Sequence, residues 1–102
     1  MISNNSTVIE RESTAQESAA HEENWMVIVF DNDFTPYLSV VQILMQATGC
    51  SLEEASIETW EVHNLGKSTV HYASEKECER VAATIRSIGI EVEVCPEFVP
   101  VN

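Results

Sequence analysis

The spacing of apolar and polar positions divides the chain at Trp25. Residues 1–24 consist mainly of Ser, Glu, Asn, Ala and Thr, and such a segment has too few large apolar side chains to build a core. We therefore predict a disordered acidic tail over residues 1–24. From Trp25 onwards apolar side chains recur regularly, which predicts one compact domain over residues 25–102.

The first apolar run predicts a strand that leads into a helix. Residues 25–30 are continuously apolar, β-branched and aromatic, which is typical of a strand covered on both faces or lying at the centre of a small sheet. The run Asp31-Asn32-Asp33 then predicts a turn, because these side chains bond to nearby backbone amides. Thr35 as N-cap and Pro36 at the first helical position predict a helix that continues to Gly49.

Two capping boxes predict the starts of the next two helices. Ser51 with Glu54 opens a helix that should run to about His63, and Ser74 with Glu77 opens the other. The apolar stripe of this last helix consists of Cys78, Val81, Ala82, Ile85 and Ile88, and Gly89 follows it as a helix-terminating residue.

Alternating segments between and after these helices predict two more strands. Residues 67–73 alternate, with Val70 and Tyr72 expected on one face, and residues 90–94 alternate strictly, as in a strand buried on one face only. Pro96 should end the regular structure. The order β-α-α-β-α-β predicts an α/β (α+β) domain in which three strands pack against three helices.

Charge and cysteine content narrow the functional classes. The formal net charge of −12 at pH 7 would repel phosphate groups, so we expect neither nucleic acid nor a membrane as partner. Cys50, Cys78 and Cys95 are odd in number and far apart, which predicts reduced thiols and no metal site. With no recognisable signal peptide or transmembrane stretch, these features predict a cytoplasmic protein.

The sequence offers little basis for catalysis. His63 or His71 could act as a general base beside Asp31 or Asp33, but no nucleophile is paired with either histidine. The common nucleotide-binding, hydrolase and metalloprotease motifs do not occur. We therefore expect a binding module without a cofactor rather than an enzyme.

Two segments resemble the Clp protease adaptor family, ClpS. They read Asp31-Asn32-Asp33-Phe34-Thr35-Pro36 after the first strand and Val62-His63-Asn64-Leu65-Gly66-Lys67 after the second helix. The resemblance extends over about residues 25–94, and the polar segment before them also looks similar to that of the family. It implies a three-stranded antiparallel sheet packed on three helices, like the C-terminal domain of the ribosomal stalk protein, and no catalytic activity.

The resemblance also implies a function and a set of site residues. Members of the family grip the free N-terminal residue of a substrate and deliver it to a Clp-type AAA+ unfoldase, here of the ClpA or ClpC class. The family positions that hold the terminal amine correspond to Asp31, Asn32 and His63. Those that line the apolar pocket for the first side chain correspond to Thr35, Tyr37, Val40, Thr59, Val62 and Val92. Arg80 lies near the position that relatives use against the unfoldase.

The chain departs from the family pattern at the site itself. The usual Asn-Asp pair is reversed as Asp31-Asn32, and Tyr37 and Thr59 replace methionines that many relatives carry, one of which gates the pocket. These changes leave open which N-terminal residues the site accepts. Two other hypotheses remain: a scaffold of the same fold that binds the unfoldase or another protein without reading N-termini, and a small hydrolase that uses His63 with Asp31.

Overall fold

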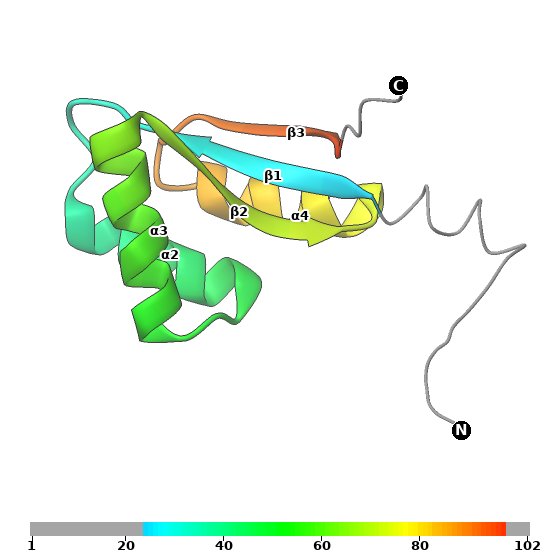
Figure 1. Ribbon diagram of the computed structural model, residues 1–102, viewed down its shortest axis with the longest axis horizontal. Coiled ribbons are helices and arrows are strands. Elements are labelled where there is room, and N and C mark those ends of the chain that lie inside the picture. The colour runs from blue at the N-terminus through cyan, green and yellow to red at the C-terminus, as the bar shows by residue number, and fades with distance from the viewer. Residues whose placement is uncertain (1–23, 98–102) are drawn as a thin grey trace, which may run out of the picture.

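A computed structural model describes residues 24–97 of the 102-residue chain. The predicted tail and the last residues of the predicted domain lie outside this range, apart from Asn24. The elements, in chain order, are β1 (Trp25–Phe30), α2 (Tyr37–Thr48), α3 (Leu52–Leu65), β2 (Lys67–Ala73), α4 (Glu75–Arg86) and β3 (Val92–Pro96). The predicted order β-α-α-β-α-β is therefore confirmed (Figure 1).

The strands form one antiparallel sheet in the order β2-β1-β3. The continuous apolar run of β1 thus occupies the centre of the sheet, as its composition predicted. Val27 and Val29 are fully buried on one face, whereas Met26, Ile28 and Phe30 alternate with them and stay partly exposed. The predicted antiparallel sheet with three helices packed against it is confirmed.

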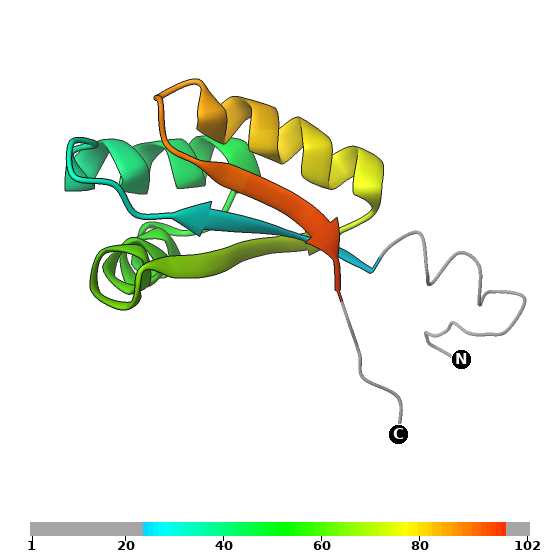
Figure 2. The same cartoon turned by 90° about the horizontal axis from the view of Figure 1, so that it is seen from above.

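The helices form the layer that buries the Val27 and Val29 face of the sheet. Helix α4 contacts all the strands, α2 packs beside α4, and α3 packs against α2 and β2 (Figures 1 and 2). Leu44 of α2 and Ile85 of α4 are the largest fully buried side chains. None of the helices within residues 24–97 has the length and apolarity required to cross a membrane.

Strand β2 contradicts the expectation that Val70 and Tyr72 share a face. Val27 pairs with His71 and the next residue of β1, Ile28, pairs with Thr69, so Val70 is an extra residue in β2. Such a bulge reverses the side-chain alternation. Val70 is consequently buried whereas Tyr72 is 59% exposed.

Strand β3 begins and ends later than residues 90–94, the range predicted from alternation. It spans Val92–Pro96, and its last residue, Pro96, pairs with Trp25. Proline lacks the amide proton that a central strand needs, but β3 is an edge strand and tolerates it. The predicted exposure pattern does hold, because Ile90 and Val92 are buried and the glutamates between and after them are exposed.

Two of the three predicted helix caps are confirmed. The hydroxyl of Ser51 accepts a hydrogen bond from the Glu54 amide at 3.0 Å, and that of Ser74 accepts one from the Glu77 amide at 3.2 Å. The prediction for α2 is wrong by one position: Pro36 is the capping residue, and no side chain caps this helix. The Thr35 hydroxyl, which we expected to cap the helix, is instead buried and has no hydrogen-bond partner among residues 24–97.

Candidate functional site

The turn that follows β1 is held by the side chain of Asn32. Its amide oxygen accepts hydrogen bonds from the backbone N–H groups of Phe34 at 3.1 Å and Thr35 at 2.8 Å. Because both lone pairs of this oxygen are used, the side-chain orientation is fixed and only the amide NH₂ group is left for a ligand. Asn32 therefore shapes the turn and can donate, rather than accept, a further hydrogen bond.

Asp31 lies beside the C-terminal end of α3. Its backbone N–H donates to the carbonyl of Gly66 at 3.0 Å, and Gly66 ends α3 in a left-handed conformation with φ of 93°. Among residues 24–97, the buried Asp31 Oδ1 has no hydrogen-bond partner, and the buried Thr35 Oγ1 also has none. A buried acceptor without a partner costs about 1–3 kcal/mol. Two such oxygens close to one turn suit a ligand that brings several donors.

His63 lies three residues before Gly66, on the last turns of α3. Its Nδ1 is 3.2 Å from the carbonyl oxygen of Thr59, and a carbonyl can only accept, so Nδ1 carries the proton in this contact. A ring with its single proton on Nδ1 presents the lone pair of Nε2. The turn thus offers a carboxylate oxygen and a hydroxyl, and the end of α3 offers an imidazole nitrogen, which are suitable acceptors for an ammonium group.

Five of the six residues predicted to line an apolar pocket are buried. Val40, Thr59 and Val62 have 0% exposure, and Thr35 and Val92 have 8% and 7%. The Thr59 hydroxyl also donates within its helix, to the Ala55 carbonyl at 2.7 Å. Val40, Val62 and Val92 belong to the hydrophobic core, and Val92 lies on β3, which packs mainly against β1 and α4.

Tyr37 is the one exposed member of the predicted pocket and joins α2 to α3. Its hydroxyl donates to the Ser56 carbonyl at 3.1 Å, and the centre of its ring lies 5.2 Å from that of His63. The ring thus bridges the first turn of α2 and the middle of α3, next to the candidate acceptors. Tyr37 therefore lies at the junction of α2 and α3.

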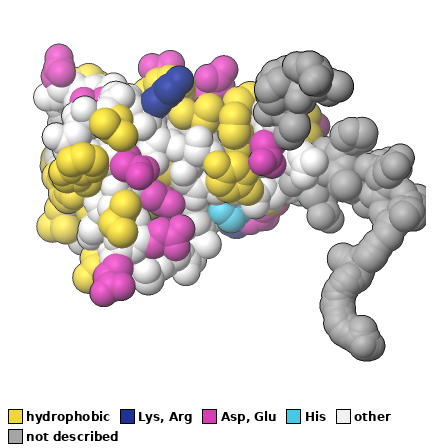
Figure 3. Space-filling view, in the orientation of Figure 1, with side chains coloured by type: hydrophobic (Ala, Val, Ile, Leu, Met, Phe, Trp, Pro, Cys, Tyr) yellow, Lys and Arg dark blue, Asp and Glu magenta, His cyan; other side chains and the backbone are white. Residues whose placement is uncertain are grey.

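An apolar groove adjoins Tyr37 on the outer side of α3. It has a volume of about 340 Å³ and is lined by Tyr37, Ser56, Ile57 and Trp60. Ile57 is 60% exposed and Trp60 is 52% exposed. Hydrophobic side chains gather over this end of the molecule in the space-filling view (Figure 3). Sequence reasoning missed the groove, although Ile57 and Trp60 fall off the buried stripe of Ala55, Thr59 and Val62.

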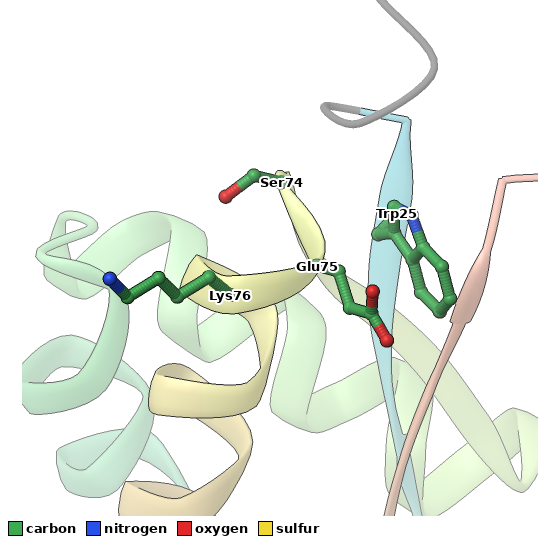
Figure 4. Close-up of a pocket in the computed structure, with 4 residues that line it drawn as sticks. All are labelled: Trp25, Ser74, Glu75 and Lys76. Carbon is green, nitrogen blue, oxygen red and sulfur yellow. The ribbon is translucent and has the colours of Figure 1, made fainter. Parts of the chain in front are cut away.

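A second hollow lies at the opposite end of β1 from the candidate site. Its volume is about 280 Å³ and it is lined by Trp25, Ser74, Glu75 and Lys76. The side chain of Glu75 points towards the Trp25 ring, whereas those of Ser74 and Lys76 point away (Figure 4). Since the Ser74 hydroxyl already caps α4, this hollow contains no converging set of polar groups.

Arg80, the expected contact for the unfoldase, is engaged within the domain. Its guanidinium donates to both carboxylate oxygens of Glu77, at 3.0 and 2.6 Å, and to the Ala47 carbonyl at 3.4 Å. The pKa of Glu77 is lowered, chiefly by its hydrogen bonds from Arg80. The guanidinium thus links α4 to the end of α2 while remaining exposed.

Glu58 is a perturbed acid that sequence reasoning did not single out. Partial burial, together with the neighbouring carboxylates of Glu54 and Glu61, raises its pKa to about 8. The buried Oε1 of Glu58 has no hydrogen-bond partner among residues 24–97. In the same part of the chain, no group of three or more His, Cys, Asp or Glu side chains is arranged to hold a metal ion.

The three-stranded antiparallel sheet and three helices define a small α+β domain. Residues 20–93 match the family model of the ATP-dependent Clp protease adaptor protein ClpS, and the chain belongs to this family. It is therefore a Clp protease adaptor. Among solved structures it is similar to ClpS2 of Agrobacterium tumefaciens, bound to L-phenylalaninamide. That similarity has a TM-score of 0.68 at 19% identity over 72% of this chain and 95% of the other. No curated protein matches the chain.

Proposed function

We propose that the protein is a cytoplasmic adaptor that holds the free N-terminal residue of an N-degron substrate and delivers it to a Clp-type AAA+ unfoldase of the ClpA or ClpC class. Asp31 and His63 receive the terminal ammonium, and Thr35 adds a hydroxyl acceptor. Asn32 keeps the turn in shape and donates to the peptide. The side chain of the first residue enters between α2 and α3 after Tyr37 moves aside.

The observation that carries this proposal is the unpartnered Asp31 Oδ1. The turn that carries this buried carboxylate oxygen contacts the end of α3, which carries an imidazole whose Nδ1 is already engaged by Thr59. A peptide ammonium has three donors and a positive charge, so it would satisfy Asp31 and the His63 lone pair together. The similar ClpS2 is bound to L-phenylalaninamide, an amino-acid amide, which supports a ligand of this chemical class.

Acetylation of the peptide tests the proposal directly. Calorimetry should compare two peptides that begin with Leu and differ only in an acetyl group on the amine. Acetylation removes the charge and two of the donors, so binding should disappear. Equal affinity for the two peptides would refute the proposal.

A matched pair of substitutions locates the amine site. Asp31→Ala should weaken binding of the free peptide about five-fold to more than a hundred-fold, since about 1–3 kcal/mol of charge-assisted hydrogen bonding is lost. Asp33→Ala removes the same charge from an exposed position in the same turn and should change affinity by less than about two-fold. Equal losses in both variants would mean that only net charge matters.

The closed core favours one alternative, a scaffold that binds the unfoldase or another protein without reading N-termini. Its supporting observation is that Val40, Thr59 and Val62 have no exposed surface. A scaffold would bind its partner equally well with the Asp31→Ala substitution and would show no difference between free and acetylated peptides. The same calorimetric series therefore separates the two hypotheses.

A further inference from the structure

We infer that the apolar groove of Tyr37, Ser56, Ile57 and Trp60 is a second subsite, which takes a large apolar side chain from the second residue of the bound peptide. This inference rests on the proposed function, because the peptide is positioned by its amine at Asp31 and His63. It adds a sequence requirement to the substrate: a free N-terminus followed by a bulky apolar residue.

The groove is continuous with the candidate amine site through Tyr37. This ring lines the groove and also lies 5.2 Å from the His63 ring. Along α3, Trp60 precedes His63 by three residues and Ile57 precedes it by six. At about 1.5 Å per residue, these positions lie roughly 4.5 and 9 Å from His63 along the helix axis. Neighbouring Cα atoms of a peptide are about 3.8 Å apart, so the side chain of the second residue can reach the groove.

The size and chemistry of the groove suit one bulky uncharged side chain. Its volume of about 340 Å³ falls within the usual range for small-ligand sites, and Trp60 and Ile57 supply the apolar surface. Glu53, four residues from Ile57 on the same helix, places a carboxylate beside this face. This charge disfavours an anionic occupant, and the net charge of −12 opposes a second copy of the chain as occupant.

The test varies only the second residue of the peptide. Calorimetry with the full-length protein should use free peptides that begin with Leu and carry Gly, Ala, Leu or Phe at position two. We expect the peptides with Leu or Phe at this position to bind about five- to twenty-fold more tightly than the Gly peptide, because apolar area is buried in the groove. Equal affinities across the series would overturn the inference.

Two substitutions on α3 connect this preference to the groove. Trp60→Ala should reduce the ratio between the Phe and Gly peptides to about two-fold or less, while binding still requires a free amine. Leu52→Ala is the matched control, since Leu52 is 58% exposed on the same helix but does not line the groove. It should leave the ratio unchanged. Circular dichroism checks that both variants fold.

The outcomes separate failure of this inference from failure of the proposed function. If the amine remains essential but the position-two preference survives Trp60→Ala, the groove is not the subsite and the adaptor function stands. If acetylated and free peptides bind equally, the proposed function itself fails, and the subsite fails with it.

Discussion

In the proposed function, Tyr37 controls which first side chain can enter the pocket. Its aromatic ring is rigid, and its hydroxyl donates a hydrogen bond to the Ser56 carbonyl. The methionine that many relatives carry at this position is flexible. Tyr37→Met should therefore broaden the accepted set among peptides that begin with Leu, Phe, Tyr or Trp. Tyr37→Phe is the control for loss of the hydroxyl alone. An unchanged ranking in Tyr37→Met would show that this ring does not gate the site.

Glu58 should make the stability of the fold depend on pH, and a substitution at this position should remove that contribution. Burial and neighbouring carboxylates raise its folded-state pKa from 4.5 to about 8, so the folded protein favours the protonated acid. Its contribution to stability is full below the unfolded pKa and is lost as the pH rises through the folded pKa. Glu58→Gln should raise the denaturation midpoint at pH 9 relative to wild type and change it little at pH 4. Parallel curves for the two proteins over this range would contradict the assignment.

At the residue scale, the hydrogen bonds of the predicted amine site could not be read from the sequence. The family resemblance implies Asp31, Asn32 and His63 together as acceptors. In the structure the Asn32 oxygen is used by two backbone amides of its own turn, whereas Asp31 Oδ1 has no partner among residues 24–97. The backbone conformation of the turn decides which side-chain oxygen accepts its N–H groups. Spacing along the chain does not specify that conformation.

Helices were predicted best where a side chain fixes their first turn. Ser51 and Ser74 bond to the amides expected of them, and α3 and α4 begin directly after these residues. The start of α2 was misplaced because a Thr-Pro pair permits the cap at either residue. The faces of β2 were misassigned because a bulge at Val70 follows from pairing with β1, which local alternation cannot reveal.

The cap of α3 also positions the candidate site, because this helix carries His63, Thr59 and the groove residues. Ser51→Ala removes the hydrogen bond to Glu54 and should lower the free energy of unfolding by about 0.5–2 kcal/mol, as measured by urea denaturation. Ser51→Asp keeps an acceptor at the N-cap and should restore most of the loss. If the Asp variant is as unstable as the Ala variant, the helix start does not depend on this cap.

For the whole molecule, element order was predictable from apolar spacing, but the closure of the site was not. The same valines that resemble pocket positions also satisfy the core, and only packing decides that Val40 and Val62 have no exposed surface. The apolar groove on α3 was likewise invisible, since exposure of Ile57 and Trp60 depends on which face of α3 meets α2 and β2. Apolar side chains outside the core therefore indicate a surface groove only when it is known which face of the helix packs against the domain.

The polar N-terminal segment supports a prediction about delivery that is separate from recognition. We propose that the unfoldase engages this segment during delivery, since a coil of 24 residues would span about 25–30 Å. β1 runs from Trp25 at the end of this segment to Phe30 beside the candidate site, so the extension joins the domain at the end remote from the turn at Asp31. Removing residues 1–22 should therefore leave peptide affinity unchanged in calorimetry. The same deletion should slow degradation of an N-degron substrate by the unfoldase and its protease, because the adaptor is no longer engaged. A scrambled segment of equal composition distinguishes length and charge from a specific motif, and equal degradation with and without residues 1–22 would rule out a role in handover.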